Sequence, residues 1–210
     1  MKEVKLKDVI KFAINGHKEI NHKFDTLPYK YHLLICEHIA LMFIHLVDDI
    51  DRINVICGLW LHDTLEDCKQ YSFNDVKKIS NIIIAELSFA LCNEKGRFRK
   101  DRANDKYYSD IKTLKDATFI KLCDRLANII YSKTFDSSMY LVYKKEHEHF
   151  KIKLYDEKYK EMFDLMEKLY LMEIHRPLWL VIIMKLNIVK KIIIRKKLYF
   201  KILVNKNDKI

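Results

Sequence analysis

The sequence predicts an all-α fold, and three observations support that class. Glycine occurs 3 times and proline twice in 210 residues, too few turn formers for a protein built of many short strands. Half of the residues are apolar, which is enough to build a hydrophobic core. Apolar residues recur at helical spacing along most of the chain, so we expect long amphipathic helices.

The N-terminal part of the chain contains the first three expected helices. The first covers residues 4–20, and a polar link then leads to Pro28. The second covers about 29–47, and the third about 52–66. Asp51 is a candidate N-cap for the third helix, because a short polar side chain there can accept a hydrogen bond from the first turn.

Further helices are expected up to about residue 173. Ser72 or Asn74 can cap a helix that runs to about 92, and the charged segment 93–105 then forms a connection. The remaining expected helices cover about 114–132, 137–150 and 155–173. The last two are amphipathic, with one strongly charged face, which is typical of helices at the outside of a bundle.

The positive charge of the chain is concentrated at its C-terminal end. Residues 175–210 contain ten Lys or Arg and one acid, a charge of +9 out of the +10 of the whole chain. We therefore expect a domain over 1–174 and a basic, apolar tail over 175–210. The tail's longest apolar run, 178–184, is too short to span a bilayer.

Four interpretations of the tail stay open. It could be a last helix packed on the domain or a read-through segment without a selected role, and these two are favoured. It could also be a basic helix in peripheral contact with a membrane surface, or a nucleic-acid contact. No specific nucleic-acid partner is expected, and the sequence does not indicate an oligomeric state.

Cysteine usage and the first residues of the chain both favour a cytoplasmic protein. The five cysteines are scattered without a C-x-x-C pair, so free thiols in a reducing compartment are expected. The first residues are charged and amphipathic, unlike a secretory signal.

The most informative segment is LWLHDTLED at residues 59–67. Positions i and i+4 share a helix face, so His62 is expected near Glu66, and Asp63 near Asp67. Imidazole and carboxylate together suit a divalent cation such as Mn²⁺, Fe²⁺ or Zn²⁺. Because buried charges are costly unless they are paired or bound to metal, a metal site is favoured over a structural accident.

Two neighbouring ligands cannot fill the coordination shell of a metal, so further ligands are expected elsewhere. Asp124 follows an apolar run, and Asn128 lies one helical turn later. Alone, Asp124 could equally pair with a neighbouring cation. His32 begins the second expected helix, where a lone histidine is more often structural. Other histidines lie among charged residues and are expected to be solvated, among them His17 and His22.

The order His32…His62-Asp63…Asp124 resembles the H…HD…D pattern of the HD superfamily of metal-dependent phosphohydrolases, whose fold is all-helical. Three segments are closer still to the RelA/SpoT hydrolase domain and the small alarmone hydrolases. HDTLEDC resembles their HD-x-x-ED signature, IKLCDRLANI their VKLADRLxN segment, and LPYKYH their xPYxxHP segment. The resemblance covers about residues 5–170.

The resemblance implies a role for each matching residue. The implied ligands of a divalent metal, Mn²⁺ in that branch, are His32, His62, Asp63 and Asp124. Glu66 and Asp67 match the acids that position or deprotonate the attacking water. Asn128 matches an asparagine near the substrate's ribose, and Lys23 matches the first residue of a basic pair.

Two positions depart from the family pattern. Phe24 stands where the second basic residue of the pair is expected, and Leu33 replaces a proline. The resemblance implies hydrolysis of the 3′-diphosphate of guanosine alarmones, with a phosphorylated nucleotide as the partner. Cationic side chains expected to bind its phosphates are Lys23, Arg97, Arg99 and Arg102, with Lys121 and Arg125 also within reach.

Two alternatives to an alarmone hydrolase stay open. The first is a phosphatase or phosphohydrolase acting on another nucleotide, which Phe24 favours. The second is a non-catalytic protein that binds a nucleotide. The presence of both Glu66 and Asp67 argues against it, because a protein without catalysis has no need for this acidic pair.

Overall fold

The computed structural model of the protein describes residues 4–93 and 98–171, and this part is all-α, as predicted. The strands within these residues are β1 (Lys23–Phe24) and β2 (Leu27–Pro28), which form a short antiparallel hairpin. No helix of the described part is long and apolar enough to cross a membrane. The predicted tail over 175–210 and the candidate Arg97 lie outside the described residues.

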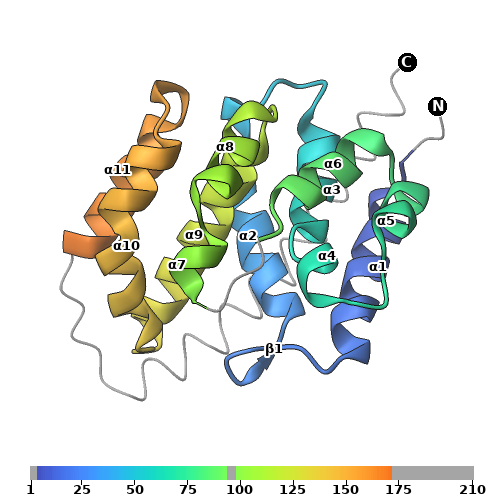
Figure 1. Ribbon diagram of the computed structural model, residues 1–210, viewed down its shortest axis with the longest axis horizontal. Coiled ribbons are helices and arrows are strands. Elements are labelled where there is room, and N and C mark those ends of the chain that lie inside the picture. Colours follow the sequence, from blue (N-terminus) through green and yellow to red (C-terminus); the bar gives the residue numbers. More distant parts are fainter. Residues whose placement is uncertain (1–3, 94–97, 172–210) are drawn as a thin grey trace. The chain divides into compact units, whose positions relative to one another are not determined.

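Four helices form the centre of the bundle: α1 (Leu6–Glu19), α2 (Lys30–Met42), α3 (Arg52–Leu61) and α9 (Ala117–Thr134). α2 packs against α9 and α3, and α3 packs against α1 and α6 (Ile82–Ala90) (Figure 1). Their shared core contains large, fully buried side chains such as Leu33, Trp60 and Phe119. The indole of Trp60 donates to Glu37 Oε1 at 2.9 Å, so this buried donor is satisfied.

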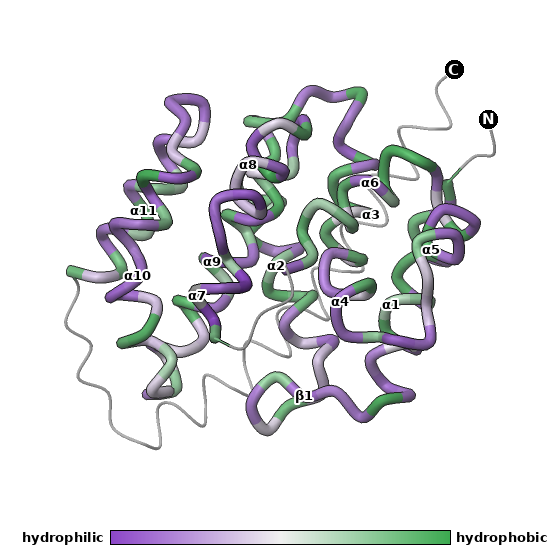
Figure 2. Tube along the Cα trace, viewed as in Figure 1, coloured by the Kyte–Doolittle hydropathy of each residue, from purple (hydrophilic) through white to green (hydrophobic). Residues whose placement is uncertain are grey.

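Three helices cover α9 on its other sides: α8 (Asp105–Thr113), α10 (Met139–Leu154) and α11 (Lys160–Leu171), the last preceded by the 3₁₀ turn η2 (Glu157–Tyr159). α10 and α11 each contain hydrophilic and hydrophobic residues (Figure 2). Along α10 the buried residues Tyr143, His147, Phe150 and Leu154 recur at helical spacing, as predicted for an amphipathic helix. α9 is therefore buried over most of its surface, which explains why even Asp124 and Arg125 on it are buried.

The helix predicted over 52–66 is interrupted in the middle of the most informative segment. α3 ends at Leu61, and a separate turn, α4 (Thr64–Asp67), follows. The ring of His62 donates through Nδ1 to the Leu59 carbonyl at 2.7 Å. That carbonyl is the acceptor that the Asp63 amide would use to continue the helix. After the break, the Glu66 carboxylate accepts hydrogen bonds from Asn93, and the expected placement of Glu66 near His62 stays a prediction.

Other predicted boundaries also change where polar side chains compete with the helix. The helix expected up to 92 divides into α5 (Phe73–Ile79) and α6, because Asn81 accepts from the Ile84 amide at 2.9 Å and caps α6. Ser72 caps α5, as predicted, in a reciprocal pair with Asp75. The second helix ends at Met42, and the 3₁₀ turn η1 (Ile44–Leu46) follows.

The segment expected as a charged connection contains more structure than predicted. A short helix, α7 (Arg99–Arg102), lies within it, and Asn104 caps α8 directly after it. α8 has many polar residues, but it buries Tyr107, Tyr108 and Ile111 against its neighbours. Two of these three are tyrosines, which can be buried or exposed, so the periodicity of this segment is weak in the sequence.

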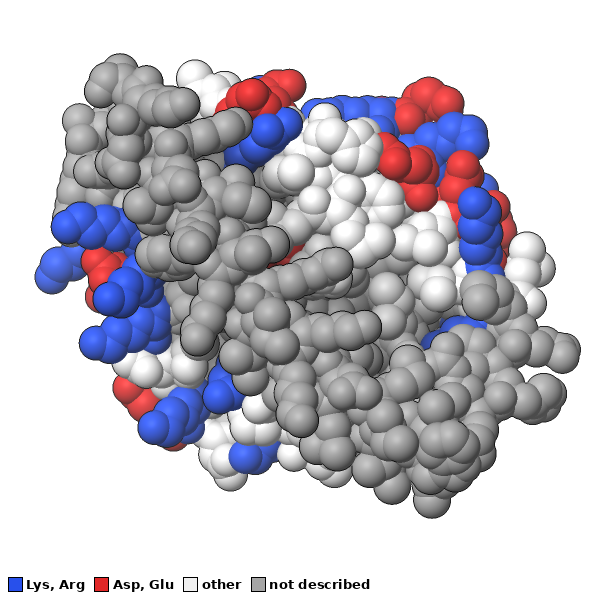
Figure 3. Space-filling model, turned by 180° about the vertical axis from the view of Figure 1, so that it is seen from behind, with Lys and Arg blue, Asp and Glu red and all other residues white. Residues whose placement is uncertain are grey.

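Charged residues of both signs lie on the face of the described part that Figure 3 shows. Seen from behind, Lys and Arg side chains are interspersed with Asp and Glu side chains at both sides of the molecule (Figure 3). This distribution agrees with the small net charge expected for residues 1–174. The division into a domain and a basic tail stays a prediction.

Candidate metal centre

The four side chains predicted as metal ligands come together where α2, α9 and the break after α3 meet. We call His32, His62, Asp63 and Asp124 the buried cluster; both histidines are 1% exposed and Asp124 is 8% exposed. His32 Nε2 lies 3.3 Å from Asp124 Oδ1 and 3.7 Å from Asp63 Oδ2. His62 Nε2 lies 2.9 Å from Asp63 Oδ2 and 3.9 Å from Asp124 Oδ1.

The orientation of the His62 ring is suited to metal binding. Because Nδ1 donates to the Leu59 carbonyl, Nε2 faces the two carboxylates. Nε2 is buried and makes no well-aligned hydrogen bond, but it lies within ion-pair distance of Asp63 Oδ2. Metal-binding histidines commonly donate their second ring nitrogen to a carbonyl or carboxylate in this way. A cation among these donors would satisfy the Nε2 atom.

The charges of the buried cluster also favour a cation. Burial disfavours a charged imidazole, but the carboxylates of Asp63 and Asp124 outweigh burial and raise the pKa of His62 to about 9. Burial acts against ionisation of Asp63 too, yet the charge of His62 holds its pKa well below the usual range. For Asp124, burial is outweighed by the Lys121 ammonium and the two histidines, which lower its pKa. The cluster therefore stabilises two anions that need positive charge beside them.

Three side chains outside the cluster fix the direction of its carboxylates. Lys121 Nζ donates to Asp124 Oδ2 at 2.8 Å, and Asn128 Nδ2 donates to Asp124 Oδ1 at 2.6 Å. The hydroxyl of Tyr29 donates to Asp63 Oδ2. Such partners hold ligand atoms in place before a metal binds. Asn128, predicted near a ribose, thus contacts a predicted ligand while it also lines the adjoining pocket.

Cys36 is a candidate ligand that the sequence analysis missed. Its Sγ lies 3.5 Å from His32 Nε2, one helical turn along α2. Ligand atoms of four buried residues lie within 4.8 Å of one another: His32, Cys36, His62 and Asp124. Burial, then Asp124, raises the pKa of the Cys36 thiol, so it stays protonated unless a cation binds. The i, i+4 spacing of His32 and Cys36 was the signal that could have identified it.

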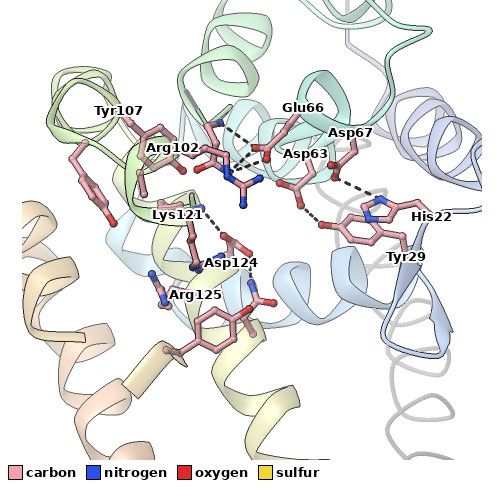
Figure 4. A pocket seen from close by; sticks show the side chains of 16 residues that line it. His22, Tyr29, Asp63, Glu66, Asp67, Arg102, Tyr107, Lys121, Asp124 and Arg125 are labelled. Atoms are coloured by element: carbon pink, nitrogen blue, oxygen red, sulfur yellow. Dashed lines mark hydrogen bonds and ion pairs between the residues drawn. The ribbon is translucent and has the colours of Figure 1, made fainter. Parts of the chain in front are cut away.

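A pocket of about 200 Å³ opens beside the buried cluster (Figure 4). Asp63, Glu66 and Asp67 lie on one side of it, while Lys121 and Arg125 lie on the other. The remaining polar residues that line the pocket include His22, Tyr29, Asn93, Arg99, Arg102, Tyr107 and Asn128. Metal donors, acids and cations therefore share one cavity.

The two acids predicted to act on water differ in their surroundings. Glu66 accepts hydrogen bonds from the Asn93 amide at 3.0 Å and from Asn93 Nδ2 at 2.9 Å, which hold its carboxylate in place. Burial, followed by the charges of Asp63 and Glu66, raises the pKa of Asp67 to about 7. Asp67 can therefore gain and lose a proton near neutral pH, as a general base must.

The structure brings only some of the predicted cations to the pocket. Arg99 lines it and is paired with Glu146 at 2.6 Å, and Arg125 Nη1 contacts the same carboxylate at 3.1 Å. Arg102 lines the pocket and has no ion-pair partner within the described part of the chain. Lys23 is exposed in β1 and is not among the lining residues.

Phe24, which replaces an expected basic residue, belongs to the wall of the buried cluster. Its ring centroid lies 4.7 Å from that of His32 and 4.3 Å from that of Tyr131. The aromatic ring thus covers one side of His32 and excludes water from it, a structural use that a cation at this position could not serve as well.

Comparison with known proteins gives no family for the chain: it matches no protein-family model, no curated protein and no solved structure significantly. The structure by itself establishes a helical bundle with a buried group of His, Cys and Asp side chains that could hold a metal ion.

Proposed function

We propose that this chain is a metal-dependent phosphohydrolase of the HD type. The observation that carries the proposal is that the buried cluster, the acid Asp67 and several cationic side chains line or adjoin one pocket. This combination is what the resemblance of residues 5–170 to HD phosphohydrolases implies. A bundle stabilised only by packing has no need for it, because burying two carboxylates and two imidazoles is costly.

The chemistry follows from the properties of these side chains. A divalent cation held by His32, His62, Asp63 and Asp124 would lower the pKa of a bound water towards neutrality and offset phosphoryl charge. Asp67, with its pKa of about 7, accepts the proton of the attacking water. The water oxygen forms a bond to phosphorus and the bond from phosphorus to the ester oxygen breaks. That oxygen takes up a proton from solvent, and Asp67 returns the proton it accepted to solvent.

Two cations are suited to the negative charge that builds up on the phosphoryl oxygens. Arg102 and Lys121 both line the pocket, and a fixed positive charge in a cavity with little water stabilises such a transition state. Lys121 also donates to Asp124, so it would support the metal ligands and the substrate together. Glu66, held by Asn93, would orient the water that Asp67 deprotonates.

We further propose that the substrate is a guanosine alarmone and that the 3′-diphosphate is released as pyrophosphate, with Mn²⁺ as the metal. The pocket of about 200 Å³ suits a diphosphate better than a whole nucleotide. A larger hollow shares Arg99, Tyr108 and Arg125 with it and would accommodate the nucleoside. The exposed aromatic ring of Phe98 at this hollow offers a face for a base.

A second candidate function is hydrolysis of a different nucleotide. The observation that favours it is Phe24, whose ring packs on His32 and supplies no charge for a phosphate. Lys23, the other member of the expected basic pair, is not among the residues that line the pocket. A substrate with fewer phosphates than guanosine tetraphosphate would need fewer cations.

The test is an assay of the Mn²⁺-loaded chain with guanosine tetraphosphate. Release of pyrophosphate, lost in Asp63→Ala and Asp67→Asn, supports the first candidate. Asp164→Asn is the matched control, because Asp164 is an exposed acid in α11 that pairs with Lys160. Orthophosphate released from simple nucleotides instead would support the second candidate. No turnover of any phosphate ester with Mn²⁺, Zn²⁺ or Fe²⁺ would refute both and leave a non-catalytic protein.

A further inference from the structure

A second group of side chains that could hold a metal ion lies at the edge of the pocket. His17, His22 and Asp67, which we call the rim cluster, offer ligand atoms that all lie within 4.8 Å of one another. From their charged neighbours both histidines are expected to be solvated, and for His17 this is wrong, because it is 1% exposed. The side chains of His22 and Asp67 are 26% and 31% exposed, and both line the pocket.

A tight turn after α1 builds the rim cluster. Asn21 has a φ of 52°, a left-handed conformation that asparagine tolerates better than most residues. The turn lets the His22 amide donate to the His17 carbonyl at 2.9 Å, and it brings the two Nδ1 atoms within 2.9 Å of each other. Asp67, at the end of α4, completes the group, with Oδ2 3.5 Å from His22 Nδ1.

The Nδ1 atoms of His17 and His22 share one hydrogen bond, and one nitrogen of the rim cluster lacks a partner altogether. His17 Nε2 is buried and has no hydrogen-bond partner. If Nε2 carries the proton of a neutral ring, the Nδ1 lone pair of His17 faces His22 and Asp67. Burial lowers the pKa of His17 to about 4, against the attraction of Asp63, and burial also lowers the pKa of His22. Both rings are therefore neutral at pH 7, the form that binds metal.

Tyr29 connects the rim cluster to the buried cluster. Its ring stacks on His22 with centroids 3.9 Å apart and planes inclined by 12°, and it lies 4.4 Å from the ring of His17. Its hydroxyl donates to Asp63 Oδ2 in the buried cluster, as Figure 4 shows. Since none of the three rim ligands is a member of the buried cluster, the two groups can bind independently.

We propose that His17, His22 and Asp67 bind a second divalent cation at the edge of the pocket. Two imidazoles and one carboxylate suit Zn²⁺, Fe²⁺ or Mn²⁺, and three protein ligands leave a position open for water or a phosphate oxygen. Asp67 would bind the ion through the oxygen nearer His22 and keep its other oxygen for the attacking water. A cation here would add positive charge beside Asp63, Glu66 and Asp67, the acids that line this side of the pocket.

This proposal does not depend on the proposed hydrolase activity, because it concerns binding of a metal ion alone. The experiment is equilibrium dialysis of the full chain against Zn²⁺, followed by measurement of bound metal per chain. The wild type is expected to bind two ions, one in each cluster. His22→Gln and Asp67→Asn should each remove one ion, and so should His62→Gln, while His22→Gln combined with His62→Gln should remove both.

His45→Gln is the matched control, because His45 is an exposed histidine paired with Glu161 and is expected to leave both ions bound. Circular dichroism of each variant shows whether its helices are retained. If His62→Gln loses an ion while His22→Gln and Asp67→Asn retain every ion that the wild type binds, the proposal is overturned. Two ions retained in both rim variants would overturn it as well. One ion that is lost only in the rim variants would support the rim cluster and contradict the buried cluster.

Discussion

The buried cluster and the rim cluster both contact Tyr29, but the pKa values of their histidines are shifted in opposite directions. In the buried cluster, two carboxylates outweigh burial and raise the pKa of His62 to about 9. In the rim cluster, burial dominates and lowers the pKa of His17 to about 4. The buried cluster therefore attracts positive charge strongly, whereas the rim cluster offers neutral nitrogens and a single carboxylate. We expect the buried cluster to bind a divalent cation more tightly.

The largest effect is expected from removing one charge of the buried cluster. Asp63→Asn should weaken its cation binding by more than about 100-fold, because loss of a residue that only hydrogen-bonds to a metal ligand already costs roughly 10–100-fold. Calorimetric titration with Mn²⁺ measures this change, and phosphate release should disappear with it. Asp164→Asn, at an exposed ion pair, should change neither quantity. Unchanged affinity in Asp63→Asn would remove Asp63 from the ligand set.

The next largest effect concerns the lysine beside Asp124. Lys121→Met leaves a buried carboxylate without its cation, which costs roughly 3–5 kcal/mol of unfolding free energy. A bound metal replaces part of the missing charge, so the loss should be smaller in Mn²⁺ than in chelator. Denaturant unfolding under both conditions measures the difference. Lys160→Met, at an exposed pair with Asp164, should change the free energy of unfolding little under both conditions, because solvent screens exposed pairs.

The metal affinity of the two clusters should depend on pH in different ways. His62, with a pKa raised to about 9, must lose its proton when a cation binds, so protons compete with the metal below that pH. Affinity of the buried cluster should therefore rise about tenfold per pH unit between about pH 7.5 and 8.5. In the rim cluster, His17 is already neutral and Asp67, with a pKa of about 7, is mostly ionised, so affinity should change little.

Variants that retain a single cluster allow the pH effect to be measured directly. His22→Gln keeps the buried cluster and Asp63→Asn keeps the rim cluster. Calorimetry in buffers of different ionisation enthalpy gives the number of protons released per ion. About one proton released by the first variant, and fewer by the second, is the expected result. Equal proton release from both would show that the two clusters do not differ in charge as described.

The contrast between the clusters also explains what the sequence could predict. The helical class and most helices follow from apolar periodicity, and each ligand of the buried cluster follows an apolar run or begins a helix. The rim cluster depends on the left-handed Asn21, which turns His22 back towards His17. Apolar periodicity does not report such a turn, so charged neighbours alone suggested that these histidines were solvated.

Breaks within helices were missed for a related reason. The His62 side chain donates to the Leu59 carbonyl, and α3 ends there. The Asn81 side chain accepts from the Ile84 amide, and α6 begins there. Both breaks lie inside apolar stretches. Periodicity continues across both breaks. The consequence is largest at His62, because the break determines which side chains Glu66 and Asp67 can reach.

The smallest expected effect comes from Cys36, the candidate sulfur ligand beside the buried cluster. Cys36 lies against His32, whereas the rim cluster contains only nitrogen and oxygen ligands. Thiolate favours Zn²⁺ over Mn²⁺, so Cys36→Ala should lower the Zn²⁺-to-Mn²⁺ affinity ratio of the buried cluster by roughly tenfold. Cys57→Ala, which removes a buried thiol of α3 outside the cluster, should leave the ratio unchanged. Competition titrations in the His22→Gln background measure the ratio without a contribution from the rim. If the ratio is the same in both cysteine variants, Cys36 packs against the buried cluster without binding its metal, and the two clusters differ in charge alone.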